Sequence, residues 1–451
     1  MKVLGISSGF HDASVSLVED GKILFATHAE RYTRKKNDPT IPNFLLKQNE
    51  DVSVFYEDVK LKNERREYHS MPPVEYEDVC DYHLKHHESH AAAAYYTAPF
   101  SNDTAIVVID AIGEWQTSSI WIPKDKKLEC VWSENYPHSI GLFYSAITKR
   151  IGLKPNEDEY ITMGMAAFGE PIVNMRWCFD LPDRNWHKGF SLTDFKGCAP
   201  EDIAASAQFE TERRINEIMQ HASKFGKNLC YGGGVALNCV ANSKVVNKHF
   251  EKVWIFPNPG DAGSSLGAAL GYIGEQIEFK NCFLGYEIMG MPNPRKIVDS
   301  LLAYKVVGVA NGKAEFGPRA LGNRSLLGDP RYNIKRTVNR IKKRQKFRPF
   351  APAILEEFAD DYFEGPKNEY MQFVSQARHD YKAVTHVDGS SRVQVVKENN
   401  PSILRKILEE YYERTKVPML LNTSLNVKGQ PLVNDWNQAQ VFQRDHQVRV
   451  F

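Results

Sequence analysis

Hydrophobic positions near the start of the chain follow the two-residue period of β-strands. Apolar residues dominate Lys2–Ser7 and Val15–Val18, and Lys22–His28 then alternates apolar with polar positions. An Asp20–Gly21 pair supplies the turn of a hairpin between the last two runs. The polar loop Gly9–Ser14 joins the first two predicted strands. Loops in this position can hold nucleotide phosphates, although an ordinary hairpin has the same pattern.

Further along the chain, short apolar runs alternate with segments of helical period. The runs predicted as strands are Thr104–Ile109 with a return strand at Ser119–Ile122, then Asn228–Tyr231, Val253–Phe256, Val306–Ala310 and Met419–Leu421. Helices are predicted for His138–Gly152, Glu201–Phe225, Leu266–Tyr272 and Ile403–Thr415, and a strand–turn–strand unit for Val384–Val395. This alternation predicts an α/β fold.

One stretch has the composition of a linker, and three others carry no assignable pattern. Gly285–Lys296 combines glycine, proline and methionine, so we expect domains at 1–285 and 297–451. Residues 44–80, residues 172–200 and the segment after Pro431 match no template of either period. We see no internal sequence repeat.

Composition excludes several classes of protein. The 451 residues are 42% hydrophobic and 25% charged, which is typical of globular domains, and the net charge of +1 gives no general attraction to nucleic acid or membrane. No apolar run approaches the ~20 residues that cross a bilayer, and the apolar part of the N-terminus is too short for a signal peptide. Seven cysteines without CxxC spacing argue against a disulfide framework, so we expect a cytoplasmic protein.

The most informative motif is His86–His87–Glu88–Ser89–His90. Residues four apart share one face of a helix, so His86 and His90 can direct both imidazoles at one point. This spacing is typical of ligands for iron, zinc or manganese when carboxylates complete the site. Two surface histidines near a helix start are the competing interpretation.

Two aspartates stand where such carboxylates would be expected. Asp110 ends the Thr104–Ile109 strand and is followed by glycine and hydroxyl residues. Asp261 lies in a glycine-rich strand-to-helix turn, where it could instead serve as a helix N-cap. The glycine triplet Gly232–Gly233–Gly234, which directly follows a predicted strand, would allow backbone N–H groups to approach a phosphate or an adenine ring.

Basic residues gather in the C-terminal third. Arg319 and Arg324 lie among glycines, which suits recognition of phosphate or carboxylate groups. Residues 331–348 contain nine basic residues and no acidic one, which indicates either a polyanion site or a helix with a solvated basic face. The polar loop Asn422–Asn426 could donate hydrogen bonds to an anion. Near the N-terminus, the charged segment 30–38 reads as a solvated loop when taken alone.

A dozen motifs in one order resemble the O-carbamoyltransferase family, which includes the nodulation-factor and the aminoglycoside and cephem antibiotic carbamoyltransferases. They cover nearly the whole chain and include GFHDAS, ERYTRKKND, HHESHAAAAYY, MGMAAFGEP, YGGGVALNCVAN, FPNPGDAGSSLGAA, EFGPRALGNRSLLGDPR, FRPFAPAI and LLNTSLN. The resemblance implies an actin/hexokinase-like N-terminal module and an α+β C-terminal module similar to threonylcarbamoyl-adenylate synthase. It further implies that carbamoyl phosphate and ATP form carbamoyl adenylate and pyrophosphate, after which the carbamoyl group passes to an acceptor hydroxyl.

The resemblance also implies roles for individual residues. His86, His90, Asp110 and Asp261 would bind Fe(II) or another divalent metal, His11 would act on the acceptor hydroxyl, and Lys36 would neutralise adenylate charge. The expected nucleotide-binding residues are Gly232, Gly233, Gly234, Asn238 and Gly263. Carbamoyl phosphate and the triphosphate of ATP, bound with Mg, would be held by Arg319, Arg324, Arg348, Arg392 and Ser424.

The acceptor and the alternatives stay open at this point. The acceptor could be a sugar, an antibiotic or a hydroxymethylated pyrimidine such as 5-hydroxymethylcytosine in DNA, which would have to leave the base stack. Other interpretations are a tRNA threonylcarbamoyl-transfer enzyme and a non-catalytic nucleotide-binding regulator. We expect no membrane partner, and the sequence leaves the oligomeric state unknown.

Overall fold

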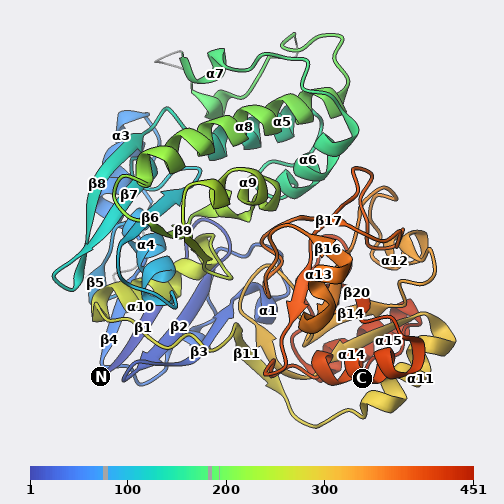
Figure 1. Cartoon of the computed structure of the whole chain (residues 1–451). Helices are drawn as coiled ribbons and strands as arrows, with labels where there is room; N and C mark the ends of the chain where they lie inside the picture. Colours follow the sequence, from blue (N-terminus) through green and yellow to red (C-terminus); the bar gives the residue numbers. More distant parts are fainter. Residues whose placement is uncertain (75–79, 181–184, 192) are drawn as a thin grey trace. The chain divides into compact units, whose positions relative to one another are not determined.

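The computed structural model describes residues 1–74, 80–180, 185–191 and 193–451, which form an α/β protein of two compact units (Figure 1). The first unit contains Met1–Ala26 and Pro39–Lys280, and the second contains Thr27–Asp38 and Asn281–Phe451. The sequence assigned residues 1–285 to one continuous domain. The structure instead places the segment Thr27–Asp38 with the C-terminal part of the chain.

The first unit is built on two five-stranded sheets that have the same topology. One sheet has the order β3-β2-β1-β4-β5 and the other the order β8-β7-β6-β9-β10. The strands of the first sheet are β1 (Lys2–Ser7), β2 (Ser14–Glu19), β3 (Lys22–His28), β4 (Val52–Phe55) and β5 (Tyr82–His83). Those of the second are β6 (Thr104–Ile109), β7 (Gln116–Lys124), β8 (Lys127–Asn135), β9 (Asn228–Gly232) and β10 (Lys252–Ile255). This doubled arrangement confirms the predicted actin/hexokinase-like fold, and it reveals a structural repeat that the sequence did not show.

Equivalent strands of the two sheets end at equivalent places. The central strand β1 runs parallel to β4 and β4 parallel to β5, so their carboxyl ends share one sheet edge. In the same way, the central strand β6 runs parallel to β9 and β9 parallel to β10. Loops at the carboxyl ends of parallel strands are where ligands bind in open α/β sheets.

Helices of the first unit cover these sheets. They are α2 (Asn43–Leu46), α3 (Val59–Tyr68), α4 (His86–Tyr96), α5 (Ile140–Arg150), α6 (Glu159–Met165), α7 (Trp177–Asp180), α8 (Pro200–Ala222), α9 (Cys239–Lys244) and α10 (Ser264–Ile273). The predicted helices 138–152, 201–225 and 266–272 are therefore confirmed as α5, α8 and α10. The unassigned stretches 44–80 and 172–200 contain α2, β4, α3 and α7, and residues 75–79, 181–184 and 192 lie outside the described part of the chain.

Glycines allow α10 to approach its neighbours closely. A Cβ atom added at Gly5 of β1 would lie 1.8 Å from the backbone oxygen of Ser265, and one added at Gly267 would lie 1.8 Å from the backbone oxygen of Ser89. Because both obstacles are backbone atoms, no side-chain rearrangement could make room. The helix α10 is thereby held against β1 on one side and against the histidine-bearing helix α4 on the other.

The second unit has its own core. Its main sheet has the order β12-β14-β20-β15-β19, and a small sheet has the order β16-β17-β18. The main-sheet strands are β12 (Val306–Ala310), β14 (Arg324–Gly328), β15 (Ala351–Leu355), β19 (Gln394–Val396) and β20 (Met419–Ser424). The small-sheet strands are β16 (Phe363–Glu364), β17 (Ser375–Ala377) and β18 (Ser390–Ser391), and the helices are α1 (Glu30–Thr33), α11 (Pro294–Tyr304), α12 (Lys335–Ile341), α13 (Ala359–Tyr362), α14 (Leu404–Thr415) and α15 (Trp436–His446).

Two predictions for this unit were wrong in part, and one unassigned segment proves to be helical. The expected linker Gly285–Lys296 holds most of a strand, β11 (Phe283–Ile288), because its backbone pairs with β13 (Gly312–Glu315). In Val384–Val395 the first expected strand is absent, and strand structure begins only at Ser390. The C-terminal segment without a recognised pattern contains α15, which buries Ala439 and Phe442.

No helix among the described residues has both the length and the apolar character that crossing a lipid bilayer requires.

The glycine contact predicts a stability difference between two glycine-to-alanine variants. Gly267→Ala should destabilise the protein by several kcal/mol, because the methyl group meets backbone atoms of α4. Gly164→Ala is the matched control, since the added methyl group at this position of α6 has no atom within 4 Å and alanine favours the helix by about 1 kcal/mol. Thermal or urea unfolding measures both variants. Equal stability of the two would contradict the close approach of α10 to α4.

Candidate functional site

The two predicted histidine ligands lie on the first turn of α4. His86 and His90 are buried, and their rings face each other with centroids 4.7 Å apart. The preceding Lys85 gives no side-chain cap, and the carboxylate of Glu114 accepts the backbone N–H of His86 at 2.8 Å instead. This bond satisfies one of the donors that a helix start leaves unpaired. The histidines are therefore part of a buried helix start, not of an exposed one.

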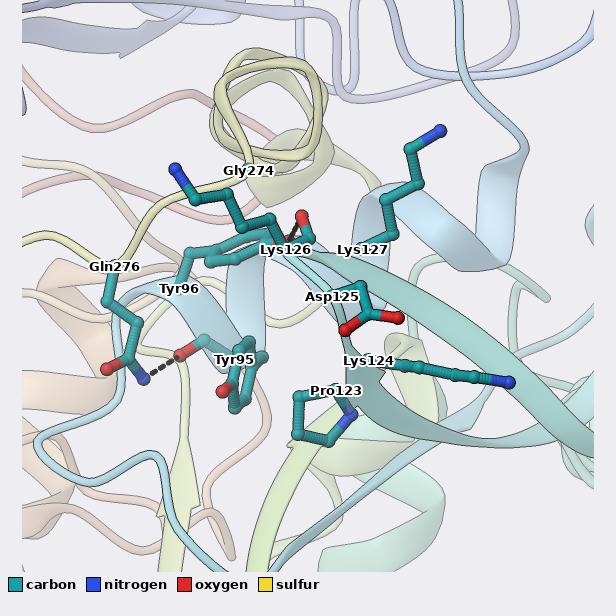
Figure 2. Close-up of a pocket in the computed structure, with 9 residues that line it drawn as sticks. All are labelled: Tyr95, Tyr96, Pro123, Lys124, Asp125, Lys126, Lys127, Gly274 and Gln276. Carbon is teal, nitrogen blue, oxygen red and sulfur yellow. Dashed lines mark hydrogen bonds between the residues drawn. The ribbon is translucent and has the colours of Figure 1, made fainter.

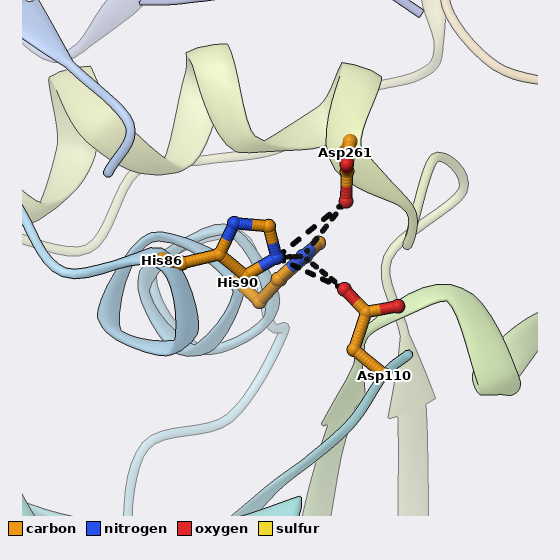
Figure 3. A group of neighbouring side chains, drawn as sticks. All are labelled: His86, His90, Asp110 and Asp261. Atoms are coloured by element: carbon orange, nitrogen blue, oxygen red, sulfur yellow. Dashed lines mark hydrogen bonds and ion pairs between the residues drawn. The ribbon is translucent and has the colours of Figure 1, made fainter. Parts of the chain in front are cut away.

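Two carboxylates converge on these imidazoles (Figure 3). Asp110, directly after β6, places its Oδ2 atom 3.0 Å from His86 Nε2 and 3.2 Å from His90 Nε2. Asp261, at the start of the short 3₁₀ helix η5 (Asp261–Gly263), places its Oδ1 atom 3.6 Å and 3.4 Å from the same two nitrogens. The N-cap of η5 is Gly260, so Asp261 does not have the N-cap role considered as its alternative. The structure thus brings all four predicted ligands together.

The spacing of the four ligand atoms suits one metal ion. Bonds of about 2.0–2.2 Å to a single ion separate neighbouring ligand atoms by about 3.0–3.6 Å. The two Nε2 atoms lie 3.1 Å apart, and all four atoms lie within 4.8 Å of one another. Two imidazoles and two carboxylates are ligands that Fe(II), Zn(II) and Mn(II) share, and two negative charges balance one divalent cation. The donor set therefore fits a divalent metal without selecting one.

Outer contacts orient the ligands. The Nδ1 atom of His90 lies 3.2 Å from Ser264 Oγ, which fixes the ring with Nε2 directed at the carboxylates. The Nδ1 atom of His86 is buried, has no hydrogen bond within the described residues, and lies 4.0 Å from a carboxylate oxygen of Glu57. Asp110 uses its other oxygen, Oδ1, to accept the backbone N–H of Gly234 at 3.1 Å.

Without a metal, the two carboxylates and the two imidazoles of the cluster shift one another's pKa values. Burial by itself lowers the pKa of His90, but hydrogen bonds from Asp110 and Asp261 outweigh it and raise the pKa to about 9. The pKa of His86 is raised as well, since the Asp261 charge and the Asp110 hydrogen bond overcome its burial. For Asp110, burial opposes ionisation, yet both histidines hold the pKa well below its ordinary value. The imidazole of His90 thus carries a proton at neutral pH when no metal is bound.

His11 lies beside this cluster. Its Nε2 atom is 3.7 Å from Asp261 Oδ2, and its Nδ1 atom is 3.1 Å from Asp12 Oδ2. Burial lowers the pKa of His11, but the charges of Asp261 and Asp12 and the hydrogen bond to Asp12 raise it to about 9. The side chain retains 31% exposure, unlike the two histidines on α4. His11 is therefore the member of this group that a substrate can reach.

The predicted nucleotide turn packs against Asp110. Gly233 has a positive φ of 87°, and a Cβ atom there would lie 2.2 Å from the backbone oxygen of Ile109. A Cβ atom at Gly234 would lie 2.8 Å from Asp110 Oδ1. Gly233 and Gly234 are thus required for close packing against Ile109 and Asp110, Gly232 lies close to the backbone of His90 on α4, and nucleotide binding at Gly232, Gly233 and Gly234 stays a prediction.

Two further residues of the predicted nucleotide set also have packing or capping roles. Asn238 caps α9 and pairs with Gln208, while a Cβ atom at Gly263 would lie 1.7 Å from the backbone oxygen of Asn258. Their part in nucleotide binding is untested.

The second unit holds the remaining predicted residues. Lys36 donates to Glu30 at 2.8 Å within the segment Thr27–Asp38. Arg324 is fully buried, and its guanidinium N–H groups bond main-chain oxygens of Asn434, Asn311, Gly312, Asn323 and Tyr286. All five donors of Arg324 are engaged, so the structure assigns it to packing of this unit and leaves no N–H group for a phosphate.

Ser424 belongs to a buried cationic group that sequence reasoning missed. Lys342 is 4% exposed, and its Nζ atom donates to Ser424 Oγ at 3.0 Å, to the Ser424 backbone oxygen, and to Asn426 Oδ1 at 2.9 Å. Burial, together with the nearby charges of Arg344 and Arg348, holds the pKa of Lys342 well below its ordinary value. Within the described residues, no carboxylate bonds this lysine. The basic run 331–348 was the signal for it, but charge alone did not show which lysine is buried.

Two other arginines that the sequence predicted to bind anions, Arg319 and Arg392, lie in loops between strands. Arg319 is partly exposed between β13 and β14. Arg392 lies between β18 and β19, and its buried Nε atom has no hydrogen-bond partner in the described part of the chain. Both keep their predicted anion-binding roles as untested expectations.

A separate hollow of about 220 Å³ lies at the tip of the β7–β8 hairpin (Figure 2). It is lined by Tyr95 and Tyr96 of α4 and by Lys124–Lys127, with Gly274 and Gln276 on one side. Gln276 donates to the Tyr95 backbone oxygen at 3.2 Å across one side. The hollow contains no group of histidines or carboxylates that resembles the cluster on α4.

Comparison with known families matches most of the chain to two family descriptions. The family description "Carbamoyltransferase N-terminus" matches residues 2–63, 55–176 and 184–270, and "Carbamoyltransferase C-terminus" matches residues 298–451. The chain belongs to the carbamoyltransferase family. It is therefore a transferase, as the sequence motifs predicted.

Related proteins cover most of the chain. An uncharacterized protein of Synechocystis is 32% identical over 96% of this chain and 92% of its own length. Nodulation protein NolNO of Sinorhizobium fredii is 28% identical over 94% of this chain and 75% of its own. Among solved structures, HypF of T. kodakarensis (15% identity, TM-score 0.37) covers 60% of this chain and 47% of its own. An activator of 2-hydroxyisocaproyl-CoA dehydratase from Clostridium difficile (14% identity, TM-score 0.37) covers 60% and 93%.

The histidine–aspartate cluster predicts metal binding that releases protons. We expect one Fe(II), Mn(II) or Zn(II) per chain, and His90→Ala should weaken binding at least about 100-fold. Since a metal binds the neutral imidazole and the metal-free pKa of His90 is about 9, apparent affinity should rise with pH from 6 to about 9.

Calorimetric titration of protein without a histidine tag, in buffers of different ionisation enthalpy, measures both the affinity and the protons released. His249→Ala is a control, because its ring bonds Asn216 away from the cluster. A wild-type protein that binds none of these ions would show that the cluster is a buried ion-pair network only.

Proposed function

We propose that this family member is an ATP-dependent O-carbamoyltransferase that works through carbamoyl adenylate. Carbamoyl phosphate, ATP and water would give carbamoyl adenylate, phosphate and pyrophosphate. An acceptor hydroxyl would then attack the carbamoyl carbon, its proton would leave, and AMP would depart. Adenylation is chemically reasonable because AMP attached through an acyl bond is a good leaving group for attack by an alcohol.

The observation that carries this proposal is the buried cluster of His86, His90, Asp110 and Asp261 with the accessible His11 at its side, in a chain of the carbamoyltransferase family. His11 is the residue we assign to the acceptor: it would orient the hydroxyl and take its proton at Nε2. A bound divalent cation would polarise carbamoyl or phosphate oxygens and would offset the Asp261 charge that keeps His11 protonated.

The second unit supports the adenylate-forming half of the proposal. A buried lysine without a bonded carboxylate is costly unless an anion approaches it. Among the described residues, Lys342 has neutral oxygens of Ser424 and Asn426 as its hydrogen-bond partners, and the nearby positive charges of Arg344 and Arg348 increase the need for negative charge. A phosphate group of ATP or carbamoyl phosphate meets that need. We therefore propose Lys342, together with Ser424 and Arg348, as a phosphate-binding group.

Two classes of acceptor fit the proposed reaction. One is a small molecule that carries a hydroxyl, such as a sugar or an antibiotic, and the other is a hydroxymethylated pyrimidine, free or in DNA. A mass-spectrometric screen for the carbamoyl mass increment, with both classes present, would identify the acceptor.

Exchange between labelled pyrophosphate and ATP in the presence of carbamoyl phosphate tests the first half-reaction. We expect exchange in the metal-loaded wild type and a loss of at least about 100-fold in Lys342→Met, because a charge-assisted phosphate contact disappears from a buried site. Lys343→Met is the matched control, since this neighbouring lysine is exposed. Wild-type protein without exchange would contradict the adenylate mechanism and would favour a non-catalytic nucleotide-binding regulator.

His11→Ala tests the division of labour between the half-reactions. Exchange should stay within about two-fold of wild type, whereas carbamoyl transfer to an acceptor found in the screen should fall by about 10²–10⁴-fold, the usual worth of an acid–base group. His446→Ala, at the end of α15, serves as the control histidine variant. Loss of exchange and transfer together in His11→Ala would show that His11 does not act in the transfer step alone.

A further inference from the structure

Phe10 is a large apolar side chain that the fold leaves exposed next to His11. It is 59% exposed in the loop between β1 and β2, although the same loop buries Ala13 completely. The loop is tied down by a hydrogen bond from the Gly9 N–H to the Pro39 oxygen at 2.9 Å. The ring thus gains little from packing in the core and leaves an aromatic face open to solvent beside His11.

The Phe10 ring is held in a defined place by two neighbours. Its centroid lies 4.6 Å from that of the His11 ring, at an interplanar angle of 46°. The Nζ atom of Lys62 lies over the Phe10 ring, 5.9 Å from its centroid. Lys62 is itself buried and fixed by Glu57 at 2.6 Å. Cation–π contacts within about 6 Å and aromatic pairs at this spacing are both attractive.

A chain of contacts connects Phe10 to the cluster. Glu57 lies 4.0 Å from His86 Nδ1, and His86 Nε2 lies 3.6 Å from Asp261. Asp261 is 3.7 Å from His11, whose ring contacts the ring of Phe10 at a tilt, and Phe10 returns through Lys62 to Glu57. An aromatic face open to solvent is therefore the neighbour of the residue that we assign to the acceptor hydroxyl.

We propose that Phe10 is the stacking surface for the acceptor, and that the acceptor carries its hydroxyl on a ring, or on a carbon attached to a ring, that has an apolar or aromatic face. This inference rests on the proposed carbamoyl transfer. A ring packed on the open part of Phe10 would have its centroid about 4.5–7 Å from that of Phe10, whose own centroid is 4.6 Å from that of His11. A hydroxyl on the side of that ring nearest His11 would then be directed to the imidazole, whereas an open-chain alcohol would have no ring face to pack on Phe10.

The shared chemistry is a ring face, which a pyranose and a pyrimidine both offer. A pyranose would place its C–H face on Phe10, and a pyrimidine would stack its π face there. A pyranose probe and a pyrimidine probe distinguish these two kinds of acceptor, so the experiment uses one of each.

Saturation-transfer NMR on the full-length, metal-loaded protein tests the proposal. The probes are methyl α-D-glucopyranoside, 5-hydroxymethyl-2′-deoxycytidine and the open-chain polyol D-glucitol. We expect one of the ring compounds to bind, D-glucitol not to bind, and Phe10→Ala to weaken the ring compound roughly ten-fold. Phe209→Ala is the matched control, because Phe209 on α8 is 60% exposed and should leave binding unchanged.

The same preparations separate this inference from the proposed function. Phe10→Ala should retain the wild-type melting temperature and wild-type pyrophosphate exchange, since the ring is exposed and does not belong to the adenylate-forming residues. Binding of neither ring compound, equal binding of D-glucitol, or unchanged affinity in Phe10→Ala would each overturn the role of Phe10. Absence of exchange in the wild type would instead overturn the proposed function, whatever the probes show.

Discussion

Two buried carboxylates, Asp110 and Asp261, set the central constraint on the first unit. Ionised carboxylates away from water cost several kcal/mol each unless positive charge or strong hydrogen bonds compensate them. The first turn of α4 supplies that compensation through His86 and His90, which in turn requires α4 to be packed tightly. The glycine contact between Gly267 of α10 and Ser89 of α4 provides that packing. The helix arrangement and the cluster therefore depend on each other.

The second unit buries two positive charges instead of two negative ones, and their surroundings differ. Arg324 is buried among main-chain oxygens that satisfy its whole guanidinium group, so its charge serves the fold. Among the described residues, Lys342 is bonded to neutral oxygens of Ser424 and Asn426, which engage all three of its N–H groups. The two cations differ in the charges around them: the carboxylate of Glu315 lies near Arg324, whereas the positive side chains of Arg344 and Arg348 lie near Lys342. This contrast separates a structural arginine from a candidate phosphate-binding lysine within one basic region.

Local patterns in the sequence predicted individual elements well and long-range pairing poorly. The strands Lys2–Ser7 and Thr104–Ile109 have the predicted bounds, because continuous apolar runs report burial on both faces of a sheet. The strand β11 was missed, since its composition is that of a linker and its partner β13 lies more than twenty residues further along. Likewise, the doubled sheet topology depends on strand order, which a single sequence without a visible repeat does not contain.

The candidate site was predictable to the extent that its residues carry their chemistry in short motifs. The spacing of His86 and His90 and the strand-end position of Asp110 were sufficient to propose a cluster, and the structure brings these residues together. Arg324 shows the limit of the same reasoning, because an arginine among glycines has one appearance in sequence whether it binds phosphate or backbone oxygens. Lys342 is a second example of this limit, because only the fold distinguishes this buried lysine from the exposed Lys343.

The repeat explains why the chemistry of the first unit lies where it does. His11 follows the central strand β1, and Asp110 follows the equivalent central strand β6. The residues after the flanking parallel strands also meet there, with Glu57 after β4, His86 after β5 and Asp261 after β10. Two copies of one loop thus approach the same carboxylate, Asp261, from different sheets. One copy presents an accessible imidazole and the other a buried carboxylate, so a duplicated framework sets the candidate metal ligands beside the residue that we propose for the acceptor.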